Sequence, residues 1–288
     1  MSTTALVLDA SSLPARRSAD GALVERAGAE LRSGQIRLEQ SLLALAAGRT
    51  CTREGSAGDE VLFVLSGRGS LRVGECVHPL EPEAGAHLLP GRAHQLSAAE
   101  GEELALVSVR ILASAGGEGA HTPAVGEGAH GPAAGGGDSD GRPQTRASAG
   151  TPAARVRRLA DQSPESATAN RQFRIIFDPA SGLRSATHFV GYIPVGRAPD
   201  HFHTYDEVIY VLEGEGAFHT AQRSWPVSAA SCIALPARTI HCLENAGRTD
   251  MRVLAVFTPA GSPAAAYYPD GTPAYENHES LHEEEVQA

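Results

Sequence analysis

GRAPDHFHTYDEVIYVLEGEG, residues 196–216, joins a run of strand-forming residues to two histidines and a glutamate. His201, His203 and Glu207 are separated by two and then four residues. Because side chains alternate across a β-strand with a period of two, we expect these three on one face. A second stretch with polar and turn-forming residues, PARTIHCLEN, follows at residues 236–245.

A metal site is the chemistry that this pattern predicts. A returning antiparallel strand would bring the imidazole of His241, in the second stretch, beside the first three side chains. Three neutral imidazoles and one carboxylate suit one divalent ion, either Fe, Mn, Ni, Cu or Zn. Such a set leaves coordination positions open for a substrate. We therefore predict a metal ion bound by His201, His203, Glu207 and His241.

The first stretch resembles the first signature motif of the cupin superfamily. That motif has a glycine, the His-x-His pair, a glutamate and a second glycine. His201, His203, Glu207 and Gly214 match it, whereas the opening glycine, Gly196, is one residue too close. The departure falls on a turn and spares every expected ligand.

The second stretch resembles the second cupin motif. Pro236, His241 and Asn245 match its proline, histidine and asparagine. Ala230 and Arg238 stand where the family usually has glycine, so the loop geometry is the feature these departures put in question.

The first half of the chain repeats the second half in degenerate form. EVLFVLSGRGSL, from Glu60, aligns with EVIYVLEGEGAF, from Glu207. The alignment pairs Glu54 with His201, Ser56 with His203, Glu60 with Glu207 and His94 with His241. The resemblance therefore implies a bicupin whose first barrel lost both imidazoles of the His-x-His pair. A structural role is favoured there, and a weak second cation site at Glu54, Glu60 and His94 is left open.

We expect an all-β chain with two tandem cupin barrels, of the double-stranded β-helix or jelly-roll type. Short apolar runs separated by glycines support this class, while residues rich in Gly, Pro and Ala between the halves indicate a flexible linker. The expected divisions are a degenerate barrel at 1–112, a linker at 113–154, a metal-binding barrel at 155–260 and an acidic tail at 261–288.

Composition narrows the partners and the compartment. The net charge of −10 argues against nucleic acid and against an anionic membrane surface as partners. No apolar run is long enough to span a membrane, and no secretory signal is evident. The four cysteines show no CxxC pair, so we expect reduced thiols and a cytoplasmic protein. Whether the chain forms a homodimer is left open.

The predicted function is that of a metal-dependent enzyme acting on a small anionic or metal-chelating oxygen ligand. A dioxygenase is the first reading, because family sites of this spacing are often dioxygenases. The alternatives are a Lewis-acid isomerase, decarboxylase or hydrolase, and a non-catalytic barrel that binds a small ligand. Tyr205, on the ligand face, and Arg238, near His241, are the candidate catalytic residues.

Several further side chains near the motifs are candidates to line the cavity around the metal site. Each is expected to be structural or exposed: Arg171, Arg174, His188 and His219. By strand alternation, Cys242 should point away from the metal, and Phe202 and Tyr210 should pack between sheets or subunits.

Overall fold

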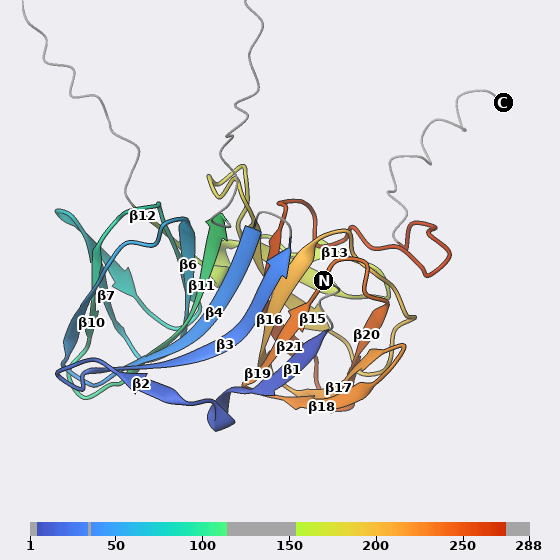
Figure 1. The fold of residues 1–288 in the computed structure, drawn as a ribbon, viewed down its shortest axis with the longest axis horizontal. Helices are drawn as coiled ribbons and strands as arrows, with labels where there is room; N and C mark the ends of the chain where they lie inside the picture. Colours follow the sequence, from blue (N-terminus) through green and yellow to red (C-terminus); the bar gives the residue numbers. More distant parts are fainter. Residues whose placement is uncertain (1–4, 34–35, 114–153, 275–288) are drawn as a thin grey trace, which may run out of the picture.

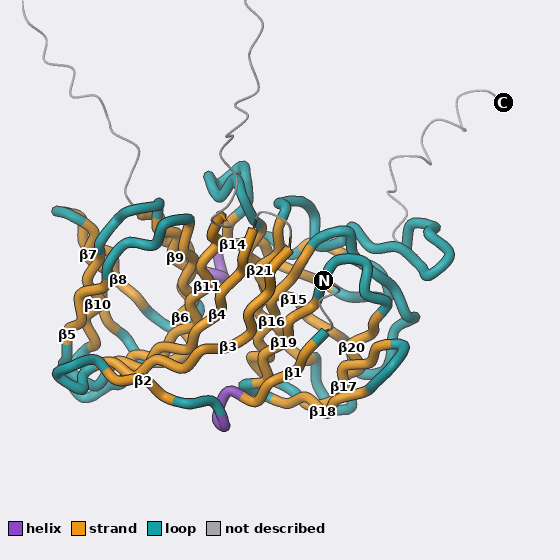
Figure 2. The backbone as a smooth tube through the Cα atoms, in the orientation of Figure 1, coloured by secondary structure: helices purple, strands orange, loops and turns teal. Residues whose placement is uncertain are grey.

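The computed structural model describes residues 5–33, 36–113 and 154–274. Two barrels of antiparallel strands lie side by side (Figure 1), and strand and loop make up almost all of the described backbone (Figure 2). The predicted all-β, two-barrel fold is therefore confirmed. The expected linker lies outside the described residues, apart from its two ends.

The first barrel consists of a seven-stranded sheet in the order β12-β9-β6-β11-β4-β3-β2 and a four-stranded sheet in the order β5-β10-β7-β8. Its strands are β2 (Ala15–Arg17), β3 (Leu23–Ser33), β4 (Ile36–Leu45), β5 (Thr50–Arg53), β6 (Asp59–Ser66), β7 (Gly69–Val73), β8 (Cys76–Leu80), β9 (Ala84–Leu88), β10 (His94–Ala98), β11 (Leu104–Ala113) and β12 (Ala154–Arg158).

The second barrel consists of a seven-stranded sheet in the order β1-β19-β16-β21-β15-β14-β13 and a three-stranded sheet in the order β18-β17-β20. Its strands are β1 (Leu6–Asp9), β13 (Glu165–Ser166), β14 (Gln172–Phe177), β15 (Thr187–Ile193), β16 (Asp206–Glu213), β17 (Glu215–Thr220), β18 (Ser224–Ser228), β19 (Ser231–Leu235), β20 (His241–Asn245) and β21 (Met251–Thr258). Two short 3-10 helices, η1 (Ala10–Ser12) and η2 (Leu159–Asp161), complete the described elements.

Strand β16 shows why its sequence is a nearly continuous apolar run. Ile209 and Val211 face the interior of the second barrel, whereas Val208 and Tyr210 face a second core between the barrels. A strand buried on both faces needs apolar residues at both parities. The expectation that Tyr210 packs between sheets is thereby confirmed.

The core between the barrels joins their two seven-stranded sheets. Phe63 and Val109 from the first barrel pack in it with Phe177 and Val208 from the second. The sheets approach so closely that a Cβ atom on Gly85 would lie 2.5 Å from a side-chain carbon of Ile176. This apolar contact holds the two barrels together.

The barrels also exchange one strand each. β1 pairs with β19 in the second barrel, although the sequence analysis placed the N-terminal residues on the first. β12, which precedes the second barrel in the chain, pairs with β9 in the first barrel. Strand order along the chain cannot reveal such pairing, because both partners are distant in sequence. The division at 1–112 and 155–260 remains a proposal, amended by these two strands.

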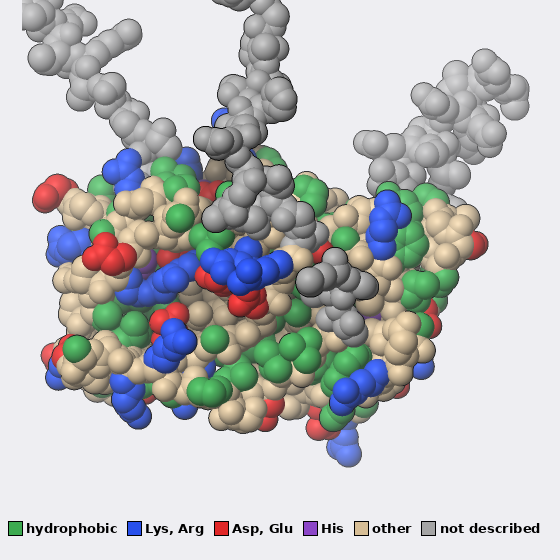
Figure 3. Space-filling view, in the orientation of Figure 1, with side chains coloured by type: hydrophobic (Ala, Val, Ile, Leu, Met, Phe, Trp, Pro, Cys, Tyr) green, Lys and Arg blue, Asp and Glu red, His purple; other side chains and the backbone are tan. Residues whose placement is uncertain are grey.

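Basic and acidic side chains lie next to one another over β3 and β4 on the face that Figure 3 shows. One such pair on β4 joins Arg37 Nη2 to Glu39 Oε1 at 2.9 Å. Among the described residues, no helix has the length and apolar character needed to cross a membrane.

Candidate metal centre

Two short backbone pairings bring three histidines together at one end of the second barrel. His201 lies before β16 and forms an antiparallel bridge with His241, the first residue of β20. Their backbone N–H groups donate to each other's carbonyls at 3.0 and 2.8 Å. His203 follows with the same strand parity as His201. The three imidazole rings consequently lie with their centroids 4.6 to 5.1 Å apart.

Each of these imidazoles is oriented by a backbone carbonyl. The Nδ1–H of His201 donates to Pro199 at 3.0 Å, and that of His241 donates to Thr239 at 2.9 Å. His203 donates in the same way to Ala265, in the segment after β21, at 3.0 Å. These hydrogen bonds fix the tautomer that leaves Nε2 unprotonated, as metal-ligating histidines require.

The three histidines are also kept uncharged. Burial, together with the neighbouring imidazoles, lowers the pKa of His203 to about 3 and that of His241 well below its usual value. Burial likewise lowers the pKa of His201. Ring nitrogens of all three lie within 4.8 Å of one another. This set of neutral, converging donors can bind a metal ion.

Glu207 lies in the same cavity but outside this group of three. Its side chain enters from β16 and is 4% exposed. Burial raises the pKa of this carboxyl to about 8, and no hydrogen bond from the described residues offsets that burial. A buried carboxyl without a partner is costly, and a nearby cation would favour its ionised form. Its position thus fits a fourth ligand, while the predicted ligand set as a whole remains a proposal.

The framework residues of the two motifs hold the loops around these ligands. Asn245 donates from Nδ2 to the carbonyls of Ile193 and Thr249 at 2.9 and 2.8 Å. Gly214 has a φ of +99°, and a Cβ atom there would lie 3.0 Å from Met251. The turn positions at Ala230 and Arg238 keep a glycine-like backbone, with φ of +72° and +61°. The loop geometry is therefore retained without glycine.

The two candidate catalytic residues differ in placement. Tyr205 lines the cavity, stacked between His203 at a centroid distance of 4.6 Å and Phe257 at 3.8 Å. Its hydroxyl lies 3.5 Å from the carbonyl oxygen of Pro263. Arg238 is exposed and is not among the residues that line the cavity. Its turn directs the side chain to solvent, while its backbone N–H donates to the carbonyl of His203. The catalytic role of Arg238 stays a prediction.

Arg171, which was expected to be structural or exposed, is the arginine that lines the cavity. It precedes β14, and its Nη2 donates to the carbonyl of Leu243 on β20 at 2.9 Å. Its positive charge contributes to lowering the pKa of all three histidines, after burial. The sequence held no local signal for this placement, because β14 reaches the site only through the closure of the barrel.

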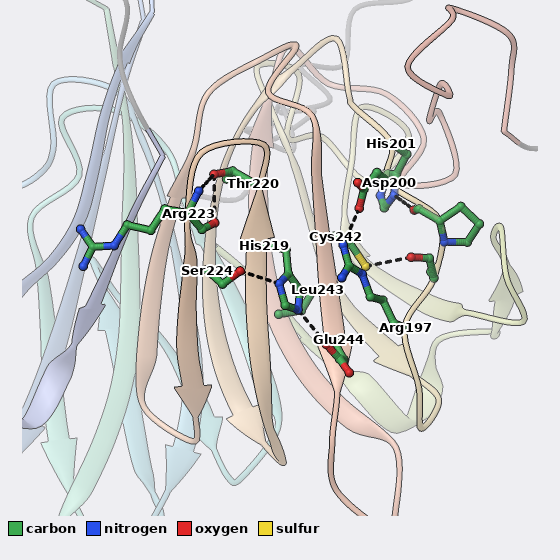
Figure 4. Close-up of polar contacts among 12 residues, drawn as sticks. Arg197, Asp200, His201, His219, Thr220, Arg223, Ser224, Cys242, Leu243 and Glu244 are labelled. Atoms are coloured by element: carbon green, nitrogen blue, oxygen red, sulfur yellow. Dashed lines mark hydrogen bonds and ion pairs between the residues drawn. The ribbon is translucent and has the colours of Figure 1, made fainter.

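Three other side chains that were named from the sequence lie outside the cavity lining. His219 is held between Ser224 and Glu244, each 2.7 Å from a ring nitrogen (Figure 4). His188 faces the core between the barrels, stacked on Phe177. Cys242 points away from the histidines, as predicted.

The thiol of Cys242 donates to the Ala198 carbonyl at 3.0 Å. The Nη1 of Arg174 donates to the carbonyl of Gln162 at 2.9 Å, and Arg174 is absent from the cavity lining. Phe202 stacks on Tyr267, so part of the expected tail docks on the barrel.

In the first barrel an arginine occupies the equivalent place. Arg53 pairs with His94 across β5 and β10 as His201 pairs with His241, so it holds the slot assigned to Glu54. Its Nη1 lies 2.6 Å from Glu60 and 3.4 Å from the imidazole of His94. Glu54 is exposed. The register differs because the first half has one residue more between Arg53 and Glu60 than the second half has between His201 and Glu207.

Comparisons with known proteins agree with this architecture. The family model described as Cupin domain (Cupin_2) matches residues 188–257. An oxalate-binding protein from Thermotoga maritima is 38% identical over 50 residues, which are 17% of this chain and 41% of that protein. This chain thus matches less than half of that relative's length.

Two solved structures cover both barrels. A putative glyoxylate-induced protein from Pseudomonas aeruginosa has a TM-score of 0.63 and 17% identity, covering 90% of each chain. A mutant of oxalate decarboxylase from Bacillus subtilis has a TM-score of 0.65 and 14% identity, covering 94% of this chain and 81% of its own. At these identities the likeness concerns the fold.

Proposed function

We propose that the second barrel is a metal-dependent enzyme site. The premise is that this chain belongs to the cupin superfamily and has its two-barrel bicupin form. The substrate of the site would be a small metabolite with anionic or metal-chelating oxygen atoms. The observation that carries this proposal is the convergence of three imidazoles whose Nδ1–H groups are each bound to a backbone carbonyl. Surface or core histidines have no need of this common orientation.

The residues present fit one divalent ion, either Fe, Mn, Ni, Cu or Zn. His201, His203 and His241 would hold it, with Glu207 as the fourth ligand. When bound, such an ion supplies Lewis-acid polarisation and, if redox-active, reaction with O2. The protein contributes a largely apolar cavity, oriented ligands and a nearby arginine.

Dioxygenase-type oxidation is the reaction we propose first. Isomerisation and hydrolysis need a positioned acid or base. In the described lining, the titratable groups besides the proposed ligands are Tyr192, Tyr205 and Arg171. The Tyr205 hydroxyl is directed to a backbone carbonyl, and a guanidinium stays protonated. Few proton carriers are thus available, which favours chemistry between a bound substrate and O2.

Decarboxylation without net oxidation is the second candidate. The printed names of an oxalate decarboxylase and an oxalate-binding protein among the similar proteins favour it. Non-catalytic ligand binding is the third, and the oxalate-binding relative bears on it equally.

Metal analysis tests the site before any substrate is known. The purified protein, loaded with Fe(II), Mn(II) or Ni(II) and desalted, should retain about one metal ion per chain, measured by mass spectrometry of the elements. His203→Ala should weaken retention by more than about 100-fold, since partners outside the ligand sphere alone are worth 10–100-fold. His219→Ala, a histidine of the same barrel outside the cavity, is the matched control. Equal retention by both variants would refute the site.

An oxygen electrode then separates the reactions. The metal-loaded protein should consume O2 with a carboxylate-bearing substrate from a panel of small acids and diols. Turnover that is unchanged under anaerobic conditions would select decarboxylation or another Lewis-acid reaction. Ligand binding without turnover in either condition would select the non-catalytic barrel.

A further inference from the structure

The cavity of the second barrel has one positively charged wall residue and a predominantly apolar remainder. Its volume is about 100 Å³. Besides the histidines, Glu207 and Arg171, much of its wall is apolar, including Phe173, Phe189, Ile209, Phe218 and Val253. The remaining polar residues of the wall are Thr168, Gln172 and Tyr192, so it offers few partners for a sugar or a polyol.

Arg171 has no carboxylate partner among the described residues. Its guanidinium donates to the Leu243 carbonyl at 2.9 Å and interacts with the Cys242 thiol, and it makes no ion pair with a described residue. Arg53, in the equivalent region of the first barrel, contrasts with it because Glu60 lies 2.6 Å away. A partly buried charge without an ion-pair partner costs free energy, and an anionic ligand would lower that cost.

Arg171 also stands between the cavity and the outside. It lines a second, outer hollow together with Gly196, Arg197 and Pro199. Arg197 is paired there with Asp200 at 3.1 Å, whereas Arg171 makes no ion pair with a described residue. Positive charge without an acidic partner raises the local concentration of anions.

We propose that Arg171 binds the carboxylate of a small monocarboxylic acid whose short hydrocarbon body lies against the apolar wall. This inference rests on the proposed function and narrows its substrate class. The guanidinium offers paired N–H donors that match a carboxylate. A second carboxylate on the far end of the ligand would be buried against phenylalanine and isoleucine without a partner. The volume of about 100 Å³ is below the ~150 Å³ of a cavity that takes benzene, which favours a body of a few carbon atoms.

Calorimetric binding to the metal-loaded protein tests the inference. The probes are 2-hydroxy-3-methylbutanoate and hydroxymalonate. Both are α-hydroxy acids, but the first carries an isopropyl group where the second carries a carboxylate of the same shape. The monocarboxylate should bind at least about tenfold more tightly. Arg171→Met should weaken its binding about 10–100-fold, and Arg171→Lys should weaken it less.

The matched control is Arg174→Met, because Arg174 lies on β14 and also donates to backbone carbonyls but does so outside the cavity. The affinity of the Arg174→Met variant for the monocarboxylic acid should equal that of the wild type. Metal content, measured on every variant, separates the two proposals. Wild-type protein that retains no metal refutes the proposed function. Metal-loaded protein that binds the acid equally well with Met, Lys or Arg at position 171, or that prefers hydroxymalonate, refutes the role of Arg171.

Discussion

Ala230 and Arg238 occupy left-handed backbone positions at which an L-residue is strained. Their φ angles are +72° and +61°, and both stand where the cupin motif usually has glycine. The Ala230 backbone N–H still donates to Val211 at 2.9 Å, so the turn forms in spite of the side chain. The left-handed conformation costs a non-glycine residue about 1–2 kcal/mol.

Replacing either residue with glycine should stabilise the protein. Glycine removes the strain but adds about 0.5–1 kcal/mol of backbone entropy to the unfolded chain. Ala230→Gly and Arg238→Gly should each raise the free energy of unfolding by roughly 0.5–1 kcal/mol, measured by urea denaturation. Ala57→Gly, at an exposed loop position without a positive φ, is the control and should lower stability. A loss of stability in both turn variants would show that the strain is absent.

At the scale of the elements, strands β5 and β10 build the first barrel around an arginine instead of imidazoles. Arg53 and Glu60 are almost completely buried, and Ser108 also donates to Glu60 at 2.6 Å. The Arg53 side chain thus places a guanidinium within 3.4 Å of His94. We expect this barrel to bind no metal, so that the chain retains about one ion.

Arg53→Met should destabilise the protein because it leaves the buried Glu60 carboxylate with the more distant Arg110, 3.8 Å away, as its remaining charge partner. The expected loss is about 3–5 kcal/mol, measured by thermal or urea denaturation. Adding Glu60→Gln to Arg53→Met should recover part of that loss, since the orphaned charge is removed. Arg72→Met, an exposed arginine of β7 in the same barrel, should change stability by less than about 0.5 kcal/mol. Equal effects of the Arg53 and Arg72 variants would contradict the buried pair.

The sequence predicted what strand alternation and motif spacing can encode. The alternation of side chains along a strand predicted that His201, His203 and Glu207 point toward one cavity and that Tyr210 points the other way, into the core between the barrels. The sequence favoured a structural or exposed place for Arg171, because the segment before β14 reaches the site only through barrel closure. It also misassigned Glu54, since one additional residue shifts a strand register and no local pattern marks the shift.

At the scale of the whole molecule, the two barrels are bound to each other by more than the chain that connects them. Exchange of β1 and β12 adds backbone pairing across the division. An ion pair between Glu83 and Arg252 lies at the same interface. Because each large sheet covers the apolar face of the other, we interpret the first barrel as structural support for the site-bearing second barrel.

Titratable groups from both barrels meet within this shared interface. His188 of β15 stacks on Phe177 at a centroid distance of 6.2 Å, and His87 of β9 approaches the same ring at 5.7 Å. Asp59 of β6 lies 2.9 Å from the Nε2 of His87 and also accepts from Ser185 at 2.8 Å. His188 has no such acidic partner, and its Nδ1 is buried without a hydrogen bond among the described residues.

His188 should make the stability of the two-barrel unit fall in acid. Burial, and then the charge of His87, lowers the pKa of His188 to about 3, whereas an unfolded histidine has a pKa of about 6.5. Between these values the unfolded chain binds a proton that the folded protein does not, so the free energy of unfolding decreases as pH falls. This one group contributes up to about 1.4 kcal/mol per pH unit. His188→Leu removes that contribution, and the difference in unfolding free energy between variant and wild type should shift in favour of the variant from pH 6.5 to pH 4. His78→Gln, a partly exposed histidine on β8, should follow the wild-type pH profile. Parallel profiles for wild type and His188→Leu would mean that His188 is protonated in the folded protein, and that its place between the barrels is not the apolar one described.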